Sequence, residues 1–315
     1  MRKGFLLLLL LPLLLQANPL RMQQRLENNQ RIFSYHFRAS EQDIRFQFAL
    51  PAASIARNGN LLQVYVPEVM QQQLWRELQQ QAQQAGSYRL IPGPGRDWQN
   101  FQVLHSYPAS SPLAADANTE RLQLQQQLQQ FSRQYQQQYL KQAGYMMLSL
   151  PDNRQLVSVD HLEIIQQSLT DIAPVAKTIV SQLAPGNPRQ LIEMLLTWIQ
   201  LIPAHPAEQA EYGRSYLPPL QLLRDHQGDS ASKTVLLAAL IRSNLPAVKQ
   251  ALLYLPGRTV LALAIPGKPD ELTVSLQGTV YLVVDPASSE LMPPGEVARS
   301  LEMYIVNQFF AYRPF

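Results

Sequence analysis

The sequence predicts an α+β fold in which a helix packs on an antiparallel β-meander, preceded by a smaller β-plus-helix region. The helix begins near Ser230, where apolar residues start to recur at spacings of three and four. The meander follows as short β-rich runs between turn signals such as Pro-Gly and Gln-Gly, and a helix followed by a meander is an α+β arrangement. Earlier in the chain, alternating apolar and polar residues predict half-buried strands.

Length and composition describe a globular protein. The chain has 315 residues, 46% of them hydrophobic, which is enough for one large or two ordinary domains. The net charge of +3 is mild and only 16% of residues are charged, so nucleic-acid binding is not expected. Because the chain has no cysteine, the fold must be stable without disulfides. Nothing in the sequence indicates a cofactor or a metal site, and the oligomeric state is left open.

Residues 1–17 have the pattern of a secretory signal peptide. Two basic residues precede a short apolar run from Phe5 to Leu15, and small or polar residues follow. The run is shorter than the roughly 20 residues of an ordinary membrane span, and no later segment is uniformly apolar over that length. We therefore expect a periplasmic mature protein without a transmembrane segment, with uncleaved anchoring as the alternative.

Residues 18–143 are predicted to form an N-terminal domain of antiparallel strands and Gln-rich helices. The patterns predict strands at 31–38, 43–50, 61–66 and 98–107, and helices at 71–84 and 119–142. Long Gln runs could instead indicate low complexity, but their apolar residues keep helical spacing. The second helix, about 36 Å long at the usual rise, is expected to be a core helix, with a spacer or docking surface as the alternative.

Residues 144–315 are predicted to form a second domain that folds without the first. A hairpin is expected at 145–159, helices at 160–183, 189–201 and from Ser230 onward, and strands at 249–255, 259–265, 272–276 and 279–284. The aromatic end of the chain is expected to dock as a closing helix or strand.

The residues around Ser230 carry the strongest signal for function. A serine at a helix start either caps the first-turn amides or acts as a nucleophile favoured by the helix dipole. The stretch SYLPPLQLLRDHQGDSASKTVLLAALIRS resembles the nucleophile segment of bacterial transglutaminase-like proteins of the papain-like cysteine-protease class, where Gly-Asp-Cys-x-Ser-Lys opens the helix. Gly228, Asp229, Ser232 and Lys233 match that motif, and Ser230 stands at the cysteine position.

The resemblance, which extends over about Gly144 to Glu296, implies the other site residues. In that family a histidine commonly follows a Pro-Gly, and here that position holds Arg258. The family's acid precedes a proline on a later strand and is matched by Asp285. Gln200 stands on the preceding helix, where the family has a glutamine that donates to the oxyanion.

Two of these positions have lost the chemistry that the family uses. A cysteine works as a thiolate beside an imidazole, whereas a serine hydroxyl needs a general base. Arg258 cannot be that base, because a guanidinium stays protonated at working pH. We instead expect Arg258 to form an ion pair with Asp285 through two parallel hydrogen bonds, the alternative being that Arg258 points to solvent.

The sequence leaves three hypotheses for function. The first is an exported, catalytically inactive transglutaminase-like module that binds or scaffolds an envelope protein or peptide partner in its old cleft. The second is an acyl-transfer hydrolase or peptidase that uses Ser230 with a relocated histidine base, either His205 or His226, while His161 is expected to be structural. The third and weakest is an envelope structural protein that acts through its Gln-rich helices.

We expect cleavage near Ala17, because the apolar run before it has the length and flanks of a signal peptide. N-terminal sequencing of the protein recovered from the periplasm checks this, and an intact Met1 in the soluble fraction would contradict it.

Overall fold

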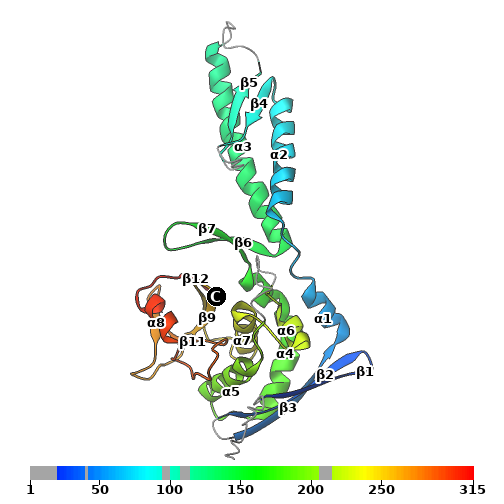
Figure 1. The fold of residues 1–315 in the computed structure, drawn as a ribbon, viewed down its shortest axis with the longest axis vertical. Helices are drawn as coiled ribbons and strands as arrows, with labels where there is room; N and C mark the ends of the chain where they lie inside the picture. Colours follow the sequence, from blue (N-terminus) through cyan, green and yellow to red (C-terminus); the bar gives the residue numbers. More distant parts are fainter. Residues whose placement is uncertain (1–19, 40–41, 94–99, 107–113, 206–214) are drawn as a thin grey trace, which may run out of the picture.

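The chain folds into a mixed α+β body from which a long arm projects (Figure 1). The computed structural model describes residues 20–39, 42–93, 100–106, 114–205 and 215–315, so the predicted signal peptide lies outside the described residues. Over these ranges the structure has eight helices and four antiparallel sheets, which confirms the α+β class. None of the helices described is long and apolar enough to span a membrane.

The first sheet consists of β1 (Arg21–Glu27), β2 (Gln30–Ala39) and β3 (Gln42–Pro51). The two alternating patterns correctly predicted β2 and β3, whose inward residues are buried aromatics and aliphatics. Strand β1 was not predicted, because this edge strand is almost entirely polar and exposed and so lacks the alternating pattern. Helix α1 (Ala52–Gly59) follows the sheet, and the strand predicted at 61–66 is wrong, since a turn and an irregular connection occupy those residues.

The arm contains both Gln-rich segments. It is built from α2 (Pro67–Gln84), β4 (Tyr88–Ile91), β5 (Gln102–His105) and α3 (Ala114–Ala143), which confirms the two predicted helices. Its apolar residues form a core separate from that of the body: Leu74, Leu78, Ala82, Phe101, Val103, Leu124 and Leu128. Most glutamines of α2 and α3 lie on the faces turned away from this core, so the Gln-rich segments form a pair of amphipathic helices.

The arm leaves and rejoins the body at one point. The Gln63 amide donates a 3.0 Å hydrogen bond to the carbonyl of Ala143. Gly144, the next residue, has a φ of +86°, and a Cβ there would lie 2.7 Å from the carbonyl oxygen of Leu61. Both facts require glycine, so the return of the chain depends on this residue.

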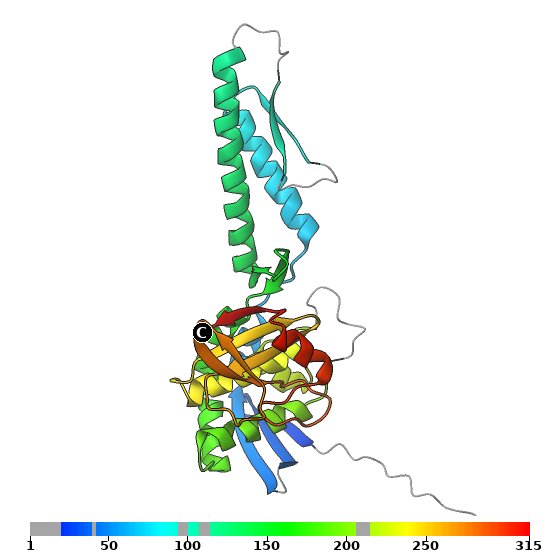
Figure 2. The ribbon, with the colours of Figure 1, turned by 90° about the vertical axis from the view of Figure 1, so that its left-hand side faces the viewer.

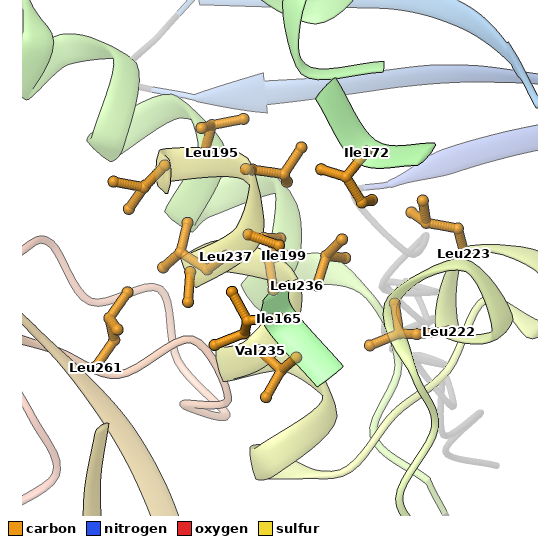
Figure 3. Close-up of a cluster of buried hydrophobic side chains, with 14 of the residues drawn as sticks. Ile165, Ile172, Leu195, Ile199, Leu222, Leu223, Val235, Leu236, Leu237 and Leu261 are labelled. Carbon is orange, nitrogen blue, oxygen red and sulfur yellow. The ribbon is translucent and has the colours of Figure 1, made fainter. Parts of the chain in front are cut away.

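The body is organised around helix α7 (Ser230–Asn244), which is covered on all sides. Helices α4 (His161–Leu183), α5 (Pro188–Leu201) and α6 (Pro219–Asp225) pack against it, and the short α6 was not predicted. Figure 3 shows the cluster in which Ile165 of α4 and Ile199 of α5 surround Val235, Leu236 and Leu237 of α7.

A five-stranded antiparallel sheet covers another side of α7. It consists of β8 (Gln250–Leu255), β9 (Arg258–Leu263), β10 (Thr273–Leu276), β11 (Thr279–Val284) and β12 (Ala311–Pro314), in the order β10-β11-β9-β8-β12. The strands were predicted, but a simple meander is wrong, because β11 lies between β9 and β10. Residues 281–284 are buried on both faces, which suits an inner strand, whereas β10 alternates and suits an edge.

Two smaller elements complete the body. The predicted hairpin is present as β6 (Tyr145–Ser149) and β7 (Gln155–Val159), beside the base of the arm (Figure 2). The aromatic end of the chain forms both a helix, α8 (Arg299–Val306), and the edge strand β12, which pairs with β8. The end of the chain is therefore docked through backbone hydrogen bonds as well as through its aromatic side chains.

The first sheet and the helices of residues 144–315 share one apolar core. Tyr35 and Phe46 pack against Trp198 of α5 with ring centroids 5.0 and 4.9 Å away, and β3 lies along α4. The division at residues 143 and 144 stays a prediction. This packing weighs against independent folding of residues 144–315, because removing the sheet would expose Trp198 to water.

We expect the arm to be removable without unfolding the body. Replacing residues 66–138 by a short Gly-Ser linker joins Tyr65 to Tyr139, whose rings are 6.4 Å apart, and leaves the core of the body unchanged. The melting temperature of the shortened protein should stay within roughly 4 °C of the full chain, the size of shift that about 1 kcal/mol produces in a protein of this length. Loss of the cooperative transition would show that the body needs the arm.

Candidate functional site

The N-terminus of α7 is held by a polar cap. Asp229 accepts 2.7 Å hydrogen bonds from both the backbone amide and the hydroxyl of Ser232, and its other oxygen accepts one from Ser215 at 2.8 Å. Gly228 precedes the cap because a Cβ there would lie 2.7 Å from the Leu222 side chain. Three matched motif positions, Gly228, Asp229 and Ser232, therefore have structural roles at the helix start.

Ser230 is tied to the neighbouring strand. Its Oγ accepts a 3.2 Å hydrogen bond from the backbone amide of Thr259, at the start of β9. One turn later, Thr234 donates from Oγ1 to the carbonyl of Thr259 at 2.9 Å. These two bonds connect the first turn of α7 to β9 and place Ser230 beside Arg258.

Arg258 and Asp285 form the ion pair expected from the sequence. Arg258 is the first residue of β9, directly after the turn at Pro256 and Gly257, and its Nη2 lies 2.9 Å from Oδ2 of Asp285. The Asp285 side chain is fully buried and that of Arg258 is 25% exposed. The pair has one hydrogen bond instead of the two expected, because Oδ1 of Asp285 accepts from the Ala287 amide at 3.0 Å.

Gln200 lies behind this ion pair, with its amide fully engaged. Its Nε2 donates to the carbonyls of Asp285 and Met292, both at 2.9 Å, and its Oε1 accepts from the Met292 amide at 3.3 Å. Both N–H donors are therefore used on the loop that follows β11. In this arrangement Gln200 positions the backbone of Asp285 and has no N–H left for an oxyanion.

Lys233 is a further member of the site. It is part of the motif at the start of α7, but the sequence did not indicate a role for it. It is 2% exposed, and its Nζ donates to the carbonyl of Gln200 at 3.3 Å. Burial and the nearby Arg258 lower the pKa of Lys233 to about 8, while Asp285 opposes the shift. The only hint in the sequence was a lysine at the start of an apolar helical run. Its burial became evident only from the structure, in which every face of α7 is covered.

Ser230 and Arg258 open onto a cavity of about 410 Å³. Its walls are the β6–β7 hairpin, the turn between β8 and β9, and the segment after α8, with lining residues that include Leu148, Leu156, Val157, Tyr254, Phe309 and Phe310. The lining is mostly apolar with a few polar groups, which is typical of ligand sites of this size. A second hollow of about 540 Å³, lined by Arg21, His36 and Arg45 of the first sheet, contains none of the predicted site residues.

Two of the chain's histidines lie near the site. His161 is buried between Tyr216 and Tyr254, with ring centroids 5.0 and 5.7 Å away, and its Nδ1 contacts the Tyr254 hydroxyl at 3.3 Å. Burial lowers the pKa of His161 to about 4, so the ring is neutral at pH 7. His226 also has a lowered pKa, from burial and then Lys233, and its Nδ1 is buried without a partner among the described residues.

The arrangement provides an anchored serine, a fixed ion pair and a cavity. The hydroxyl of Ser230 accepts from a backbone amide, and neither His161 nor His226 has a hydrogen bond to it in the part of the chain described. Within the described residues, no group of His, Asp and Glu side chains is arranged to hold a metal ion. No family model, curated protein or solved structure matches the chain.

We expect Arg258→Ala and Asp285→Ala to be energetically coupled. Arg258→Ala leaves a buried carboxylate without its partner, so the free energies of unfolding of the two single variants should not add, with coupling of about 1 kcal/mol or more. Urea unfolding of the wild type, both single variants and the double variant measures this. The exposed pair Arg224 and Asp225 is the control, where coupling should stay below about 1 kcal/mol. Strictly additive losses for Arg258 and Asp285 would contradict the pairing.

We expect Lys233 to make stability rise at alkaline pH. The pKa of Lys233 is about 8 in the folded protein, below its value of about 10.4 in an unfolded chain, so between these values the unfolded chain binds more protons and unfolding becomes harder as pH rises. The stability of the wild type relative to Lys233→Met should therefore increase by about 3 kcal/mol between about pH 7 and about pH 10.5. Urea unfolding measures the difference, and a pH-independent value would show that Lys233 keeps its ordinary pKa.

Proposed function

We propose that this protein is an exported, catalytically inactive transglutaminase-like module that binds a protein or peptide partner in the cell envelope. The observation that carries the proposal is the Arg258–Asp285 ion pair, which occupies the positions of the base and its orienting acid. A guanidinium held by a buried carboxylate cannot accept the proton of Ser230. The cavity beside this pair remains large enough for a ligand.

The arrangement of elements supports a papain-like core. In such a core the nucleophile-position helix packs on an antiparallel sheet whose neighbouring strands carry the base and acid positions. Here α7 packs on β9, which carries Arg258, and β11 pairs with β9 and leads directly into Asp285.

The hydrogen bonds of the site support loss of catalysis. Ser230 accepts from Thr259, Gln200 is used to hold the backbone after β11, and Lys233 donates to a carbonyl. Ser230 and Gln200, at the nucleophile and oxyanion-donor positions, are therefore both engaged by the backbone. Periplasmic localisation is part of the proposal and rests on the pattern of residues 1–17.

We expect no labelling of Ser230 by a serine-reactive fluorophosphonate, because an unassisted serine hydroxyl is a weak nucleophile. The wild type and Ser230→Ala should give the same background signal on a fluorescence gel, with a known serine hydrolase as the positive control. Labelling of the wild type that disappears in Ser230→Ala would instead establish the hydrolase hypothesis, with a base supplied by another residue.

A further inference from the structure

The wall of the cavity contains more positive than negative charge. Arg258 lines the cavity and is half-buried, whereas Lys233 and the Asp285 carboxylate are buried behind it and do not line the cavity. His226 lies near Lys233. Burial and the charge of Lys233 lower the pKa of His226, so its ring is neutral at pH 7. Gln200 approaches Lys233 from α5 with a neutral carbonyl. One positive charge is therefore left without a counter-charge in this cluster.

Arg258 also has an unused donor. Its Nη2 is bound to Asp285, but its Nε is buried and has no hydrogen-bond partner within the described residues. Buried donors are almost always satisfied, so this one is unusual. Because the Nε itself is closed off, a ligand in the cavity would contact the part of the Arg258 side chain that stays exposed. The N-terminus of α7, a helix of 15 residues, meets the same cavity at Ser230 and adds the positive end of its dipole.

The other two charged residues that line the cavity pair with each other. Asp152 and Arg154, at the tip of the β6–β7 hairpin, form a 2.7 Å ion pair. Asp229 is bound to Ser215 and Ser232 on the other side of the helix start. Among the residues that line the cavity, Arg258 is thus the cation that no other lining residue pairs with, which suits a single carboxylate.

Resting on the function proposed above, we propose that the cavity binds the carboxyl terminus of a peptide with apolar last residues. The terminal carboxylate lies beside Arg258, and the side chains occupy the apolar space between the hairpin and the β8–β9 turn. A cavity of about 410 Å³ is at the small end of ligand sites and accommodates a chain end more readily than a whole helix. Polar lining residues such as Ser158 match the amides of a peptide and have no partner on a hydrocarbon chain.

The proposal links binding to the protonation of Lys233. Lys233 does not line the cavity, but it lies close enough to Arg258 to feel its charge. A carboxylate bound beside Arg258 would therefore favour the charged form of Lys233 and raise its pKa above about 8. The ligand therefore binds with uptake of a proton at about pH 8, and its affinity falls as pH rises through that value. Asp285 and Arg258 face Lys233 in both states, and their opposing charges are already present in the free protein.

Fluorescence polarisation with N-terminally labelled peptides tests the proposal. The probes are hexapeptides that end in Leu, Val or Phe, each made with a free carboxylate and with a carboxamide. We expect the carboxylate form of at least one probe to bind the full-length protein about tenfold to a hundredfold more tightly than its amide, the range expected for a charge-assisted hydrogen bond. Equal affinities for the two forms, or no binding of any probe at about 1 mM protein, would overturn the proposal.

A matched pair of variants assigns the binding to Arg258. Arg258→Gln combined with Asp285→Asn removes the cation without leaving a buried charge unpaired, and should abolish the preference for carboxylate over amide. Arg224→Gln combined with Asp225→Asn makes the same charge change at an exposed pair away from the cavity and should keep the preference. A preference that survives the first double variant contradicts the proposal.

Two further measurements separate this proposal from its alternatives. Oleate carries the same carboxylate on a hydrocarbon chain, and if it displaces the peptide at lower concentration than the unlabelled peptide does, the ligand is a fatty acid and the peptide assignment fails. Fluorophosphonate labelling of Ser230 would refute catalytic inactivity, while the comparison of carboxylate with amide can still be made in Ser230→Ala. Failure of the peptide proposal with no labelling leaves the inactive binding module in place.

Discussion

The complete burial of helix α7 is the constraint on which the rest of the structure depends. Residues 232–241 are all buried, so other elements must cover every face of the helix. Helices α4, α5 and α6 cover part of it and the strands around β9 cover the rest. The apolar residues that fill this space, such as Val235 and Leu237, have no exposed side from which a substituted side chain could escape.

This burial determines what the polar residues of α7 can do. A lysine in such a helix must lose most of its hydration, and the lowered pKa of Lys233 is the result. Thr234 and Ser232 satisfy their hydroxyls locally, through Thr259 and Asp229. Only Ser230, in the first turn, reaches the cavity. The helix therefore presents one serine and its N-terminus to the cavity, and its other polar groups support the fold.

Arg258 gives the site a fixed positive charge. A histidine gains and loses a proton near neutral pH, whereas an arginine carries a permanent charge and five donors in a rigid plane. One of those donors holds Asp285, and another, on Nε, is unsatisfied within the described residues. A site built for proton transfer would thereby become a site of fixed positive charge, which is suited to recognition.

The arm has a separate physical basis. Its seven core residues contact one another and not the core of the body, so its stability comes from its own small interior. A unit of two helices and two strands of this size buries limited apolar surface, and little of that surface lies at the connection near Gly144. The surface of the arm consists largely of glutamine, which provides many hydrogen-bonding groups without net charge.

The sequence alone was enough to predict most of the helices and strands, and it led us to expect one ion pair between residues distant in the chain. Helical spacing predicted α2, α3 and α7, and alternation predicted β2 and β3. The family resemblance led us to expect the pairing of Arg258 with Asp285, which the structure shows. The tertiary structure decided the position of β11 beside β9, the shared core of the first sheet with α5, the burial of Lys233 and the cavity under the β6–β7 hairpin. The reason is physical: periodicity reports which face of one element is apolar, whereas the element that covers this face is chosen by packing between distant segments.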